Sequence, residues 1–150
     1  MPREKSAGAI VYRMENGAPH FLLLRYHSGH WEFPRGHVEN GESEEETVKR
    51  EIKEETGLAD IKIMPKFREY TKFFFRKTYN LKPEEKKNAP WVFKLVILYL
   101  AETKTKDIKI SEENTGFLWL PFEQALKRTT YKQAKEVLKK ANKYIMENAR

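Results

Sequence analysis

The chain has 150 residues, 39% hydrophobic and 34% charged, and its formal net charge is +7 at pH 7. This length and composition exclude a disordered or fibrous chain, and the absence of cysteine excludes disulfides, thiolate metal sites and cysteine nucleophiles. Because no apolar run approaches the roughly 18 residues that cross a bilayer, and the first residues lack a signal peptide's apolar stretch, we expect one cytoplasmic domain over residues 1–150 without a membrane partner.

Two apolar segments in the first part of the chain are typical of paired strands. Residues 8–12 and 20–27 are rich in aliphatic and aromatic side chains, and Asn16-Gly17 stands between them. An Asn-Gly pair favours the tight turns that join antiparallel strands, so the two segments predict a hairpin. Trp31, which follows the second segment, is expected to pack against the core.

A helix is predicted over about residues 44–56. Ser43 and Glu46 have the spacing of a capping box, in which each side chain bonds the backbone N–H of the other residue. Gly57 suits the left-handed backbone conformation that commonly ends a helix.

The second half of the chain predicts more strands and a final helix. Strands are expected around residues 60–64, 67–78, 91–102 and 117–120, with a loop over 79–90. Apolar residues then recur at helical spacing, with lysines mostly on the other side: Tyr131, Ala134, Leu138, Ala141 and Ile145. Because such a helix packs on a sheet, we expect an α/β domain with helices on the faces of a mixed sheet.

Negative charge is concentrated in the segment 39–55. It holds eight acids and three bases, so its net charge is −5 and the rest of the chain carries +12. This charge distribution suits a site where carboxylates bind cations while the surrounding field attracts a polyanion. On charge alone, a solvated helix on a generically basic surface is an equally good interpretation.

The spacing of three glutamates favours the first interpretation. Glu51, Glu54 and Glu55 share one face of the predicted helix, where their charges repel unless a cation lies among them. Hard oxygen ligands indicate Mg²⁺ or Mn²⁺ rather than zinc or copper. Such ions bridge phosphate oxygens and lower the pKa of water, so the pattern predicts phosphate chemistry without a covalent nucleophile.

Residues 36–58 resemble the Nudix box: Gly, five residues, Glu, seven residues, then Arg-Glu-apolar-any-Glu-Glu-any-Gly-apolar. Every defined position is filled, by Gly36, Glu42, Arg50, Glu51, Ile52, Glu54, Glu55, Gly57 and Leu58. The resemblance implies a Nudix fold, a mixed β-sheet sandwiched between α-helices. It also implies the following site: Glu51, Glu54, Glu55 and the Gly36 carbonyl as ligands of Mg²⁺ or Mn²⁺, oriented by Glu42 and Arg50.

Outside the box, the chain is similar to the asymmetrical diadenosine tetraphosphate hydrolases. The similarity is carried by residues 31–42, the apolar segment 21–24, residues 94–102 and 117–120, and the helix near Tyr131. It implies a dinucleoside polyphosphate substrate, cleaved by water to ATP and AMP.

Four residues are candidates for substrate binding by this resemblance. Arg35 and His37 flank the box glycine and would contact phosphate oxygens, although many proteins of the subgroup carry Lys where Arg35 stands. Lys94, at the start of a strand, would also bind phosphate; otherwise it is an edge-strand lysine. Tyr131 would stack on adenine, and a core position in the helical apolar stripe is its alternative.

The catalytic base has three candidates. Glu113, in the segment before residues 117–120, is the first choice, because similar hydrolases place a glutamate near the metals there. Glu112 is its neighbour and rival, and Glu51 is an alternative within the box. For the first two, an exposed loop glutamate is the competing interpretation.

Other functions fit the same box. Hydrolysis of the 5′ end of RNA is one alternative. The net positive charge supports it, and Trp91 and the aromatic run 73–75 could hold a nucleic acid. Hydrolysis of nucleoside triphosphates or nucleotide sugars is another. A nucleotide-binding sensor module is a third, although such a module would be expected to have lost a box glutamate. We expect a monomer or weak dimer.

Overall fold

The computed structural model of the chain describes residues 3–78 and 81–148, which build a mixed seven-stranded sheet. Its strands are β1 (Arg3–Glu15), β2 (Ala18–Tyr26), β3 (Trp31–Glu32), β4 (Arg35–His37), β5 (Lys62–Arg76), β6 (Trp91–Glu102) and β7 (Asn114–Pro121). β1 runs parallel to β6, and every other pairing is antiparallel. The predicted mixed sheet is therefore confirmed.

Strand β1 has three partners: β6 pairs with one of its edges, and β4 and β2 share the other. Residues 6–8 pair with β4, whereas residues 12–15 pair with β2. The turn between β1 and β2 places Asn16 and Gly17 at φ 53° and 80°, the conformation for which an Asn-Gly pair is favoured, so the predicted hairpin is confirmed. β4 is short and pairs only with residues 6–8 of β1, and the chain continues from it into helix α1.

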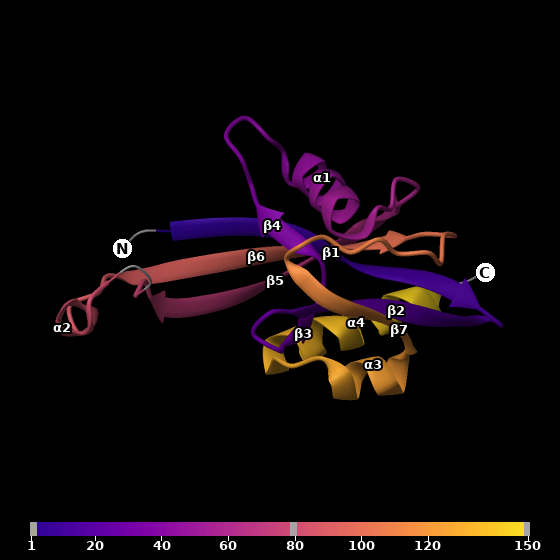
Figure 1. The fold of residues 1–150 in the computed structure, drawn as a ribbon. Helices are drawn as coiled ribbons and strands as arrows, with labels where there is room; N and C mark the ends of the chain where they lie inside the picture. Colours follow the sequence, from indigo (N-terminus) through magenta and orange to yellow (C-terminus); the bar gives the residue numbers. More distant parts are fainter. Residues whose placement is uncertain (1–2, 79–80, 149–150) are drawn as a thin grey trace.

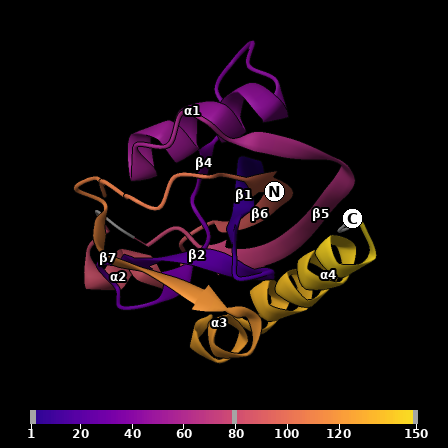
Figure 2. The ribbon, with the colours of Figure 1, turned by 90° about the vertical axis from the view of Figure 1, so that its right-hand side faces the viewer.

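Helices cover both faces of the sheet (Figures 1 and 2). They are α1 (Glu44–Thr56), α2 (Pro83–Lys86), α3 (Phe122–Arg128) and α4 (Lys132–Asn148). Val48 and Ile52 of α1 pack into one hydrophobic cluster with β1 and β2, and α3 and α4 close a second cluster on the opposite face. The predicted sandwich of a sheet between helices is confirmed.

Helix α1 has the predicted bounds and the predicted ends. The Ser43 hydroxyl accepts the Glu46 N–H and the Glu46 carboxylate accepts the Ser43 N–H, at 3.1 and 3.0 Å. Gly57 adopts φ 78° and its N–H donates to the Lys53 carbonyl. The backbone groups at both ends are thus paired within the local sequence, which explains why the helix was predictable.

Three expectations need correction. The strands predicted at 60–64 and 67–78 form the single strand β5, which carries an irregularity where Lys66 takes φ 64°. The expected loop over 79–90 contains α2, and its residues 79 and 80 lie outside the described residues. Tyr131 precedes α4 and is 40% exposed, so its alternative position in the buried stripe of the helix was wrong.

Helix α4 lies along the outer edge of β5. The Gln133 side-chain amide donates to the Lys72 carbonyl and accepts the Lys72 N–H, at 2.8 and 2.9 Å. Tyr144 donates its hydroxyl to the Pro65 carbonyl at 2.6 Å. None of the helices built from residues 3–78 and 81–148 has the length and apolar character needed to span a membrane.

One carboxylate ties the start of α1 to three strands. Glu44 pairs with Lys5 of β1 and with Arg68 of β5, whose two nitrogens donate at 2.8 and 2.9 Å, and it accepts the Tyr99 hydroxyl of β6 at 2.7 Å. The hydrogen bonds from Arg68, followed by those from Lys5 and Tyr99, hold the pKa of Glu44 well below its ordinary value of 4.5. The ionised form is therefore the one that stabilises the fold.

Glu44→Gln is expected to lower the free energy of unfolding at pH 7 by about 1–2 kcal/mol, since partly exposed charge-assisted bonds are lost. A depressed folded pKa gives stability that is present above the unfolded value and lost as pH falls below it. The difference from wild type should therefore shrink below pH 4.5, in urea unfolding followed by circular dichroism. Glu45→Gln, an exposed change next along the helix, is the control; an equal loss there would contradict the role of Glu44.

Candidate active site

Two adjoining hollows meet where β4, α1 and the loop before β7 come together. The first has a volume of about 360 Å³ and is lined by Ser6, Tyr26, Arg35, Gly36, His37, Glu39, Glu51, Lys94 and Glu113. The second, of about 310 Å³, is lined by Glu51, Glu54, Glu55, Ser111, Glu112 and Glu113. Because Glu51 and Glu113 line both, a cationic cleft opens directly into a carboxylate cluster.

Gly36 forms the wall between β4 and the glutamates. A Cβ atom at this position would overlap the carboxyl group of Glu51. A larger residue here would force the Glu51 carboxyl group to move away from the β4 backbone. The box glycine is explained by this close approach rather than by a positive φ.

Glu55 is buried to 1% exposure beneath the cluster. It accepts the Tyr26 hydroxyl at 3.1 Å and the Arg35 backbone N–H at 2.8 Å. Burial raises the pKa of Glu55 to about 8, and the charges of Glu51 and Glu113 add to this, while the two hydrogen bonds act in the opposite direction. Without a further positive charge, this carboxyl group is held in its neutral form near pH 7.

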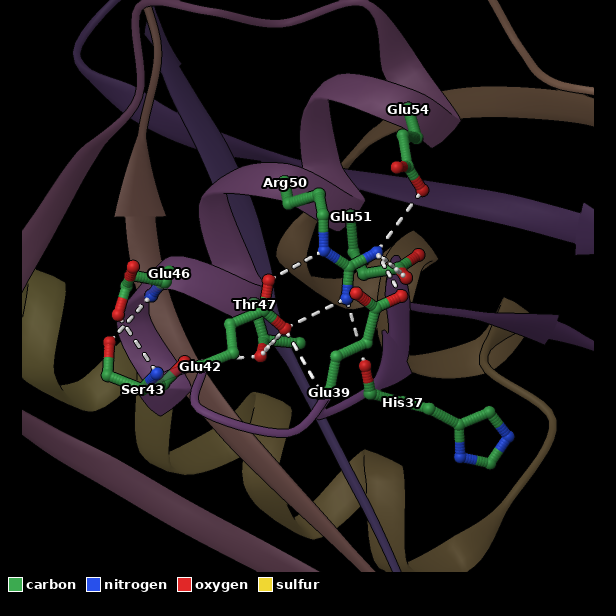
Figure 3. A network of polar contacts seen from close by, with 9 residues as sticks. All are labelled: His37, Glu39, Glu42, Ser43, Glu46, Thr47, Arg50, Glu51 and Glu54. Carbon is green, nitrogen blue, oxygen red and sulfur yellow. Dashed lines mark hydrogen bonds and ion pairs between the residues drawn. The ribbon is translucent and has the colours of Figure 1, made fainter.

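The Arg50 guanidinium connects the loop after β4 to helix α1 (Figure 3). It donates to Glu42 at 2.7 and 3.0 Å, to Glu51 at 2.7 Å and to the His37 carbonyl at 3.0 Å. Glu42 also accepts the Thr47 hydroxyl at 2.6 Å, and the bond from Arg50, followed by that from Thr47, lowers its pKa to about 2. Glu42 therefore remains ionised and anchors Arg50.

The carboxylates are not already grouped around a single point. In residues 3–78 and 81–148, no three acidic or histidine side chains are arranged to hold a metal ion. Glu51 faces Arg50, Glu55 faces Tyr26, and the Glu54 side chain is 57% exposed, 3.5 Å from Arg50. The donor set still fits a hard divalent cation, because it consists of oxygens and includes a buried carboxyl group that lacks a cationic partner in the described bonds.

Two cations face the larger hollow. Arg35 is mostly buried and forms an ion pair with the buried Glu32; burial alone would lower the pKa of Arg35, but the ion pair raises it. Burial, together with the charge of Arg35, lowers the pKa of Lys94. His37 is exposed at the rim. The structure thus brings together the three cationic or imidazole residues selected from the sequence, in a cleft suited to an anion.

A row of rings leads away from the carboxylates. Tyr26 and His30 are stacked with centroids 5.0 Å apart, His30 lies 5.5 Å from Tyr131, and Phe73 lies 6.2 Å from Tyr131. Of these rings, Tyr131 was expected from the sequence, whereas Tyr26 and His30 were not. The turn that joins these two rings is closed by the bond from the Tyr26 N–H to the His30 carbonyl, and Ser28-Gly29 is its sequence signal.

The loop before β7 brings both predicted base candidates to the cluster. Glu113 lines both hollows, and its charge is close enough to raise the pKa of Glu51 and of Glu55. Glu112 lines only the smaller hollow, and its carbonyl accepts a bond from His27 at 2.6 Å. Trp31 packs against the core, as predicted.

This site has the pattern of a known family. The family model described as the NUDIX domain matches residues 2–141. The chain belongs to the NUDIX domain family. It is a Nudix pyrophosphohydrolase, and enzymes of this family generally use divalent metal ions.

Relatives of this Nudix hydrolase cover between 73% and 96% of its length. The asymmetrical bis(5′-nucleosyl)-tetraphosphatase of Mus musculus is 32% identical over 153 residues, which cover 94% of this chain and 95% of the relative. The crystal structure of a Caenorhabditis elegans Ap4A hydrolase binary complex superposes with a TM-score of 0.78 at 28% identity, covering 96% and 98% of the two chains. An RNA pyrophosphohydrolase of Nitratiruptor is 30% identical over 120 residues, 73% of this chain and 74% of the relative.

With divalent ions removed, Glu55→Gln is expected to stabilise this Nudix protein at pH 8 by about 4 kcal/mol. Because the folded pKa of Glu55 exceeds its ordinary value of 4.5, the folded wild type binds the extra proton and loses stability as pH rises from about 4.5 to about 8. The variant does not lose this stability. The difference in free energy of unfolding between variant and wild type should therefore grow as pH rises from about 4.5 to about 8, measured by urea unfolding with a chelator present. The exposed neighbour variant Glu54→Gln should show no such gain; a pH-independent difference for Glu55→Gln would refute the buried charge as the cause.

Proposed function

We propose that this Nudix pyrophosphohydrolase cleaves diadenosine tetraphosphate to ATP and AMP in the presence of Mg²⁺ or Mn²⁺. The observation that carries the proposal is the continuity of three surfaces: a carboxylate cluster, a cationic cleft and a row of aromatic rings. A dinucleoside polyphosphate presents the matching features, namely a long anionic chain that ends in an adenosine. The near full-length similarity to asymmetrical tetraphosphatases supports this substrate class.

The metal would be held by the Gly36 carbonyl and by Glu51, Glu54 and Glu55. When bound, such a cation would offset negative charge on the phosphate chain and make a water molecule easier to deprotonate. Glu55 needs a positive charge to ionise near neutral pH, and such a cation supplies it. Arg50, anchored by Glu42, holds Glu51 beside the Gly36 backbone and limits the positions available to this ligand.

The phosphate chain would lie along Arg35, His37 and Lys94. Arg35 is fixed by Glu32, so its guanidinium is oriented before the substrate arrives. Lys94 is half-buried and repelled by Arg35, and an anion in the cleft would relieve both effects. The exposed ring of Tyr131 lies beside His30 and Phe73. This ring would stack on an adenine base.

Glu113 would act as general base. It lines the two hollows at their junction, where a water molecule approaching the phosphorus would lie. Removal of a proton from that water lets its oxygen attack the phosphorus of one terminal bridging phosphate, and ATP leaves. The water oxygen then belongs to AMP. Glu112 and Glu51 are the alternatives for this role.

Incubation with diadenosine tetraphosphate, Mg²⁺ and ¹⁸O-labelled water is expected to give ATP and AMP, with the label in AMP by mass spectrometry. Attack at the terminal bridging phosphorus is the physical reason for that position of the label. Two ADP molecules, or no turnover, would overturn the substrate while leaving the Nudix site in place. Label in ATP would overturn the site of attack.

Glu54→Gln is expected to lower Mg²⁺-dependent turnover at least ~10-fold, because one charged oxygen donor is lost from the proposed metal site. Its side chain is mostly exposed, so the melting temperature should remain close to that of wild type. Steady-state assays over a range of Mg²⁺ concentrations provide the measurement. Glu45→Gln removes the same charge from the first turn of α1 and serves as the control; full activity of Glu54→Gln would refute the ligand assignment.

Tyr131→Ala is expected to raise KM for diadenosine tetraphosphate ~5- to 100-fold with a smaller change in kcat, because a stacking surface is removed far from the reacting phosphorus. Tyr131→Phe keeps the ring and should retain the wild-type KM. Equal KM values for the alanine variant and wild type would show that adenine binds elsewhere.

A second candidate is hydrolysis of the 5′ end of RNA, which the similarity to an RNA pyrophosphohydrolase favours. The two candidates share the metal and phosphate residues and differ in what lies beyond the phosphates. A comparison of kcat/KM for diadenosine tetraphosphate and for a 5′-triphosphorylated oligoribonucleotide separates them.

A further inference from the structure

One half of the sheet extends beyond helix α1. The beginning of β1, the beginning of β6 and the end of β5 project on the left of Figure 1, with α2 at the tip. On the α1 side, packing of the hydrophobic cluster reaches Leu95 of β6. Within residues 3–78 and 81–148, no helix lies over the strand positions beyond it on that side.

The exposed side chains of this region alternate between rings and cations. Tyr70, Lys72, Phe74 and Arg76 follow one another at every second position of β5 and therefore share one face. In β6, Phe93 lies opposite Phe74 and Trp91 lies opposite Arg76. We call these six residues the hairpin face: Tyr70, Lys72, Phe74, Arg76, Trp91 and Phe93.

The rings of the hairpin face are unusually open to solvent. Tyr70, Phe74 and Trp91 are 52%, 60% and 49% exposed. Phe74 and Phe93 are 5.1 Å apart between centroids, and the Arg76 guanidinium lies 4.8 Å from the centre of the Trp91 ring. Lys72 lies 5.2 Å from the centre of Tyr70. Several large rings kept at one surface, each beside a cation or another ring, indicate a ligand that presents planar groups.

The charge of the region selects the class of ligand. None of the six residues is acidic, and Arg3 and Lys5 of β1 lie in register with Phe93 and Leu95 on the same face. Glu44, which pairs with Lys5 and Arg68, stands at the α1 border of the region. An apolar protein partner would have to bury Lys72 and Arg76 without an anion, which is costly. A ligand that carries both flat rings and regularly spaced anions avoids this cost.

We propose that the hairpin face binds single-stranded nucleic acid. Unpaired bases stack on Phe74, Trp91 and Tyr70, while Lys72 and Arg76 turn from the rings to the phosphates. Positions two apart on a strand are separated by about 6–7 Å, a distance that an extended chain of nucleotides spans. Stacking of this kind is tolerant of sequence, because every base has a flat face.

This site is separate from the catalytic cleft. Phe73 and Lys94 alternate with the residues of the hairpin face, so they point to the opposite side of the same two strands, toward Tyr131 and Arg35. The inference therefore does not rest on the proposed substrate. A bound strand leaves the Nudix cleft open.

The test is fluorescence anisotropy of a 12-nucleotide oligouridine that carries a 5′ hydroxyl and a 3′ fluorophore, with a chelator present. This probe has no phosphate anhydride, so binding does not depend on the hydrolase activity. Wild type is expected to bind at low salt, with a slope of log affinity against log salt of about −1.4 for the two phosphate contacts of Lys72 and Arg76. Absence of binding at low salt would overturn the inference.

Variants separate stacking from charge. Phe74→Ala and Trp91→Ala should each weaken binding ~5- to 100-fold, whereas Met146→Ala, an exposed apolar change on α4, should not. Arg76→Gln should reduce the salt slope by about 0.7, and Lys139→Gln on α4 should leave it unchanged. All five variants should keep the wild-type hydrolase activity, which also shows that they fold.

Two further results would overturn the inference. Equal affinity for a duplex of the same length would show that charge alone is responsible, because paired bases are not free to stack. Self-association of wild type that Phe74→Ala abolishes in sedimentation velocity, without any change in affinity for RNA, would identify the hairpin face as a contact between copies of this chain.

Discussion

The contact between Arg50 and the surrounding carboxylates is the interaction on which the site depends. Glu42, Glu51 and Glu54 crowd one side of α1, and their mutual repulsion would open the loop after β4 if no positive charge stood among them. Arg50 supplies that charge and also reaches the His37 carbonyl, so one guanidinium joins the helix to the loop. It does not bond Glu55. The buried Glu55 carboxyl group is bonded instead by two neutral donors, the Tyr26 hydroxyl and the Arg35 backbone N–H.

Features determined by neighbouring residues were predictable, and features that depend on distant contacts were not. The bounds of α1 follow from Ser43, Glu46 and Gly57, which act within one helical turn. The stack of Tyr26 on His30 and the bond from Tyr26 to Glu55 require β2, a turn and α1 to meet, and no local pattern records that. The roles given to individual site residues remain predictions for the experiments described.

Two errors have specific physical causes. Two strands were expected, at 60–64 and 67–78, but Lys66 between them adopts a left-handed conformation and the register shifts, so one strand, β5, continues through both segments. Tyr131 stands at helical spacing from Ala134 and Leu138, yet α4 begins one residue later. Periodicity identifies a helical face but does not identify where the helix begins, and for Tyr131 that difference separates a core ring from an exposed one.

The bond pair between Gln133 and Lys72 has a consequence for assembly. An outer strand with free N–H and C=O groups is a template on which another chain can add a strand. The Gln133 side-chain amide bonds both the N–H and the C=O of Lys72, as a residue of a further strand would. The pairing stops there, because Gln133 belongs to helix α4 and not to a strand. Addition of a further strand along β5 is thereby obstructed at Lys72.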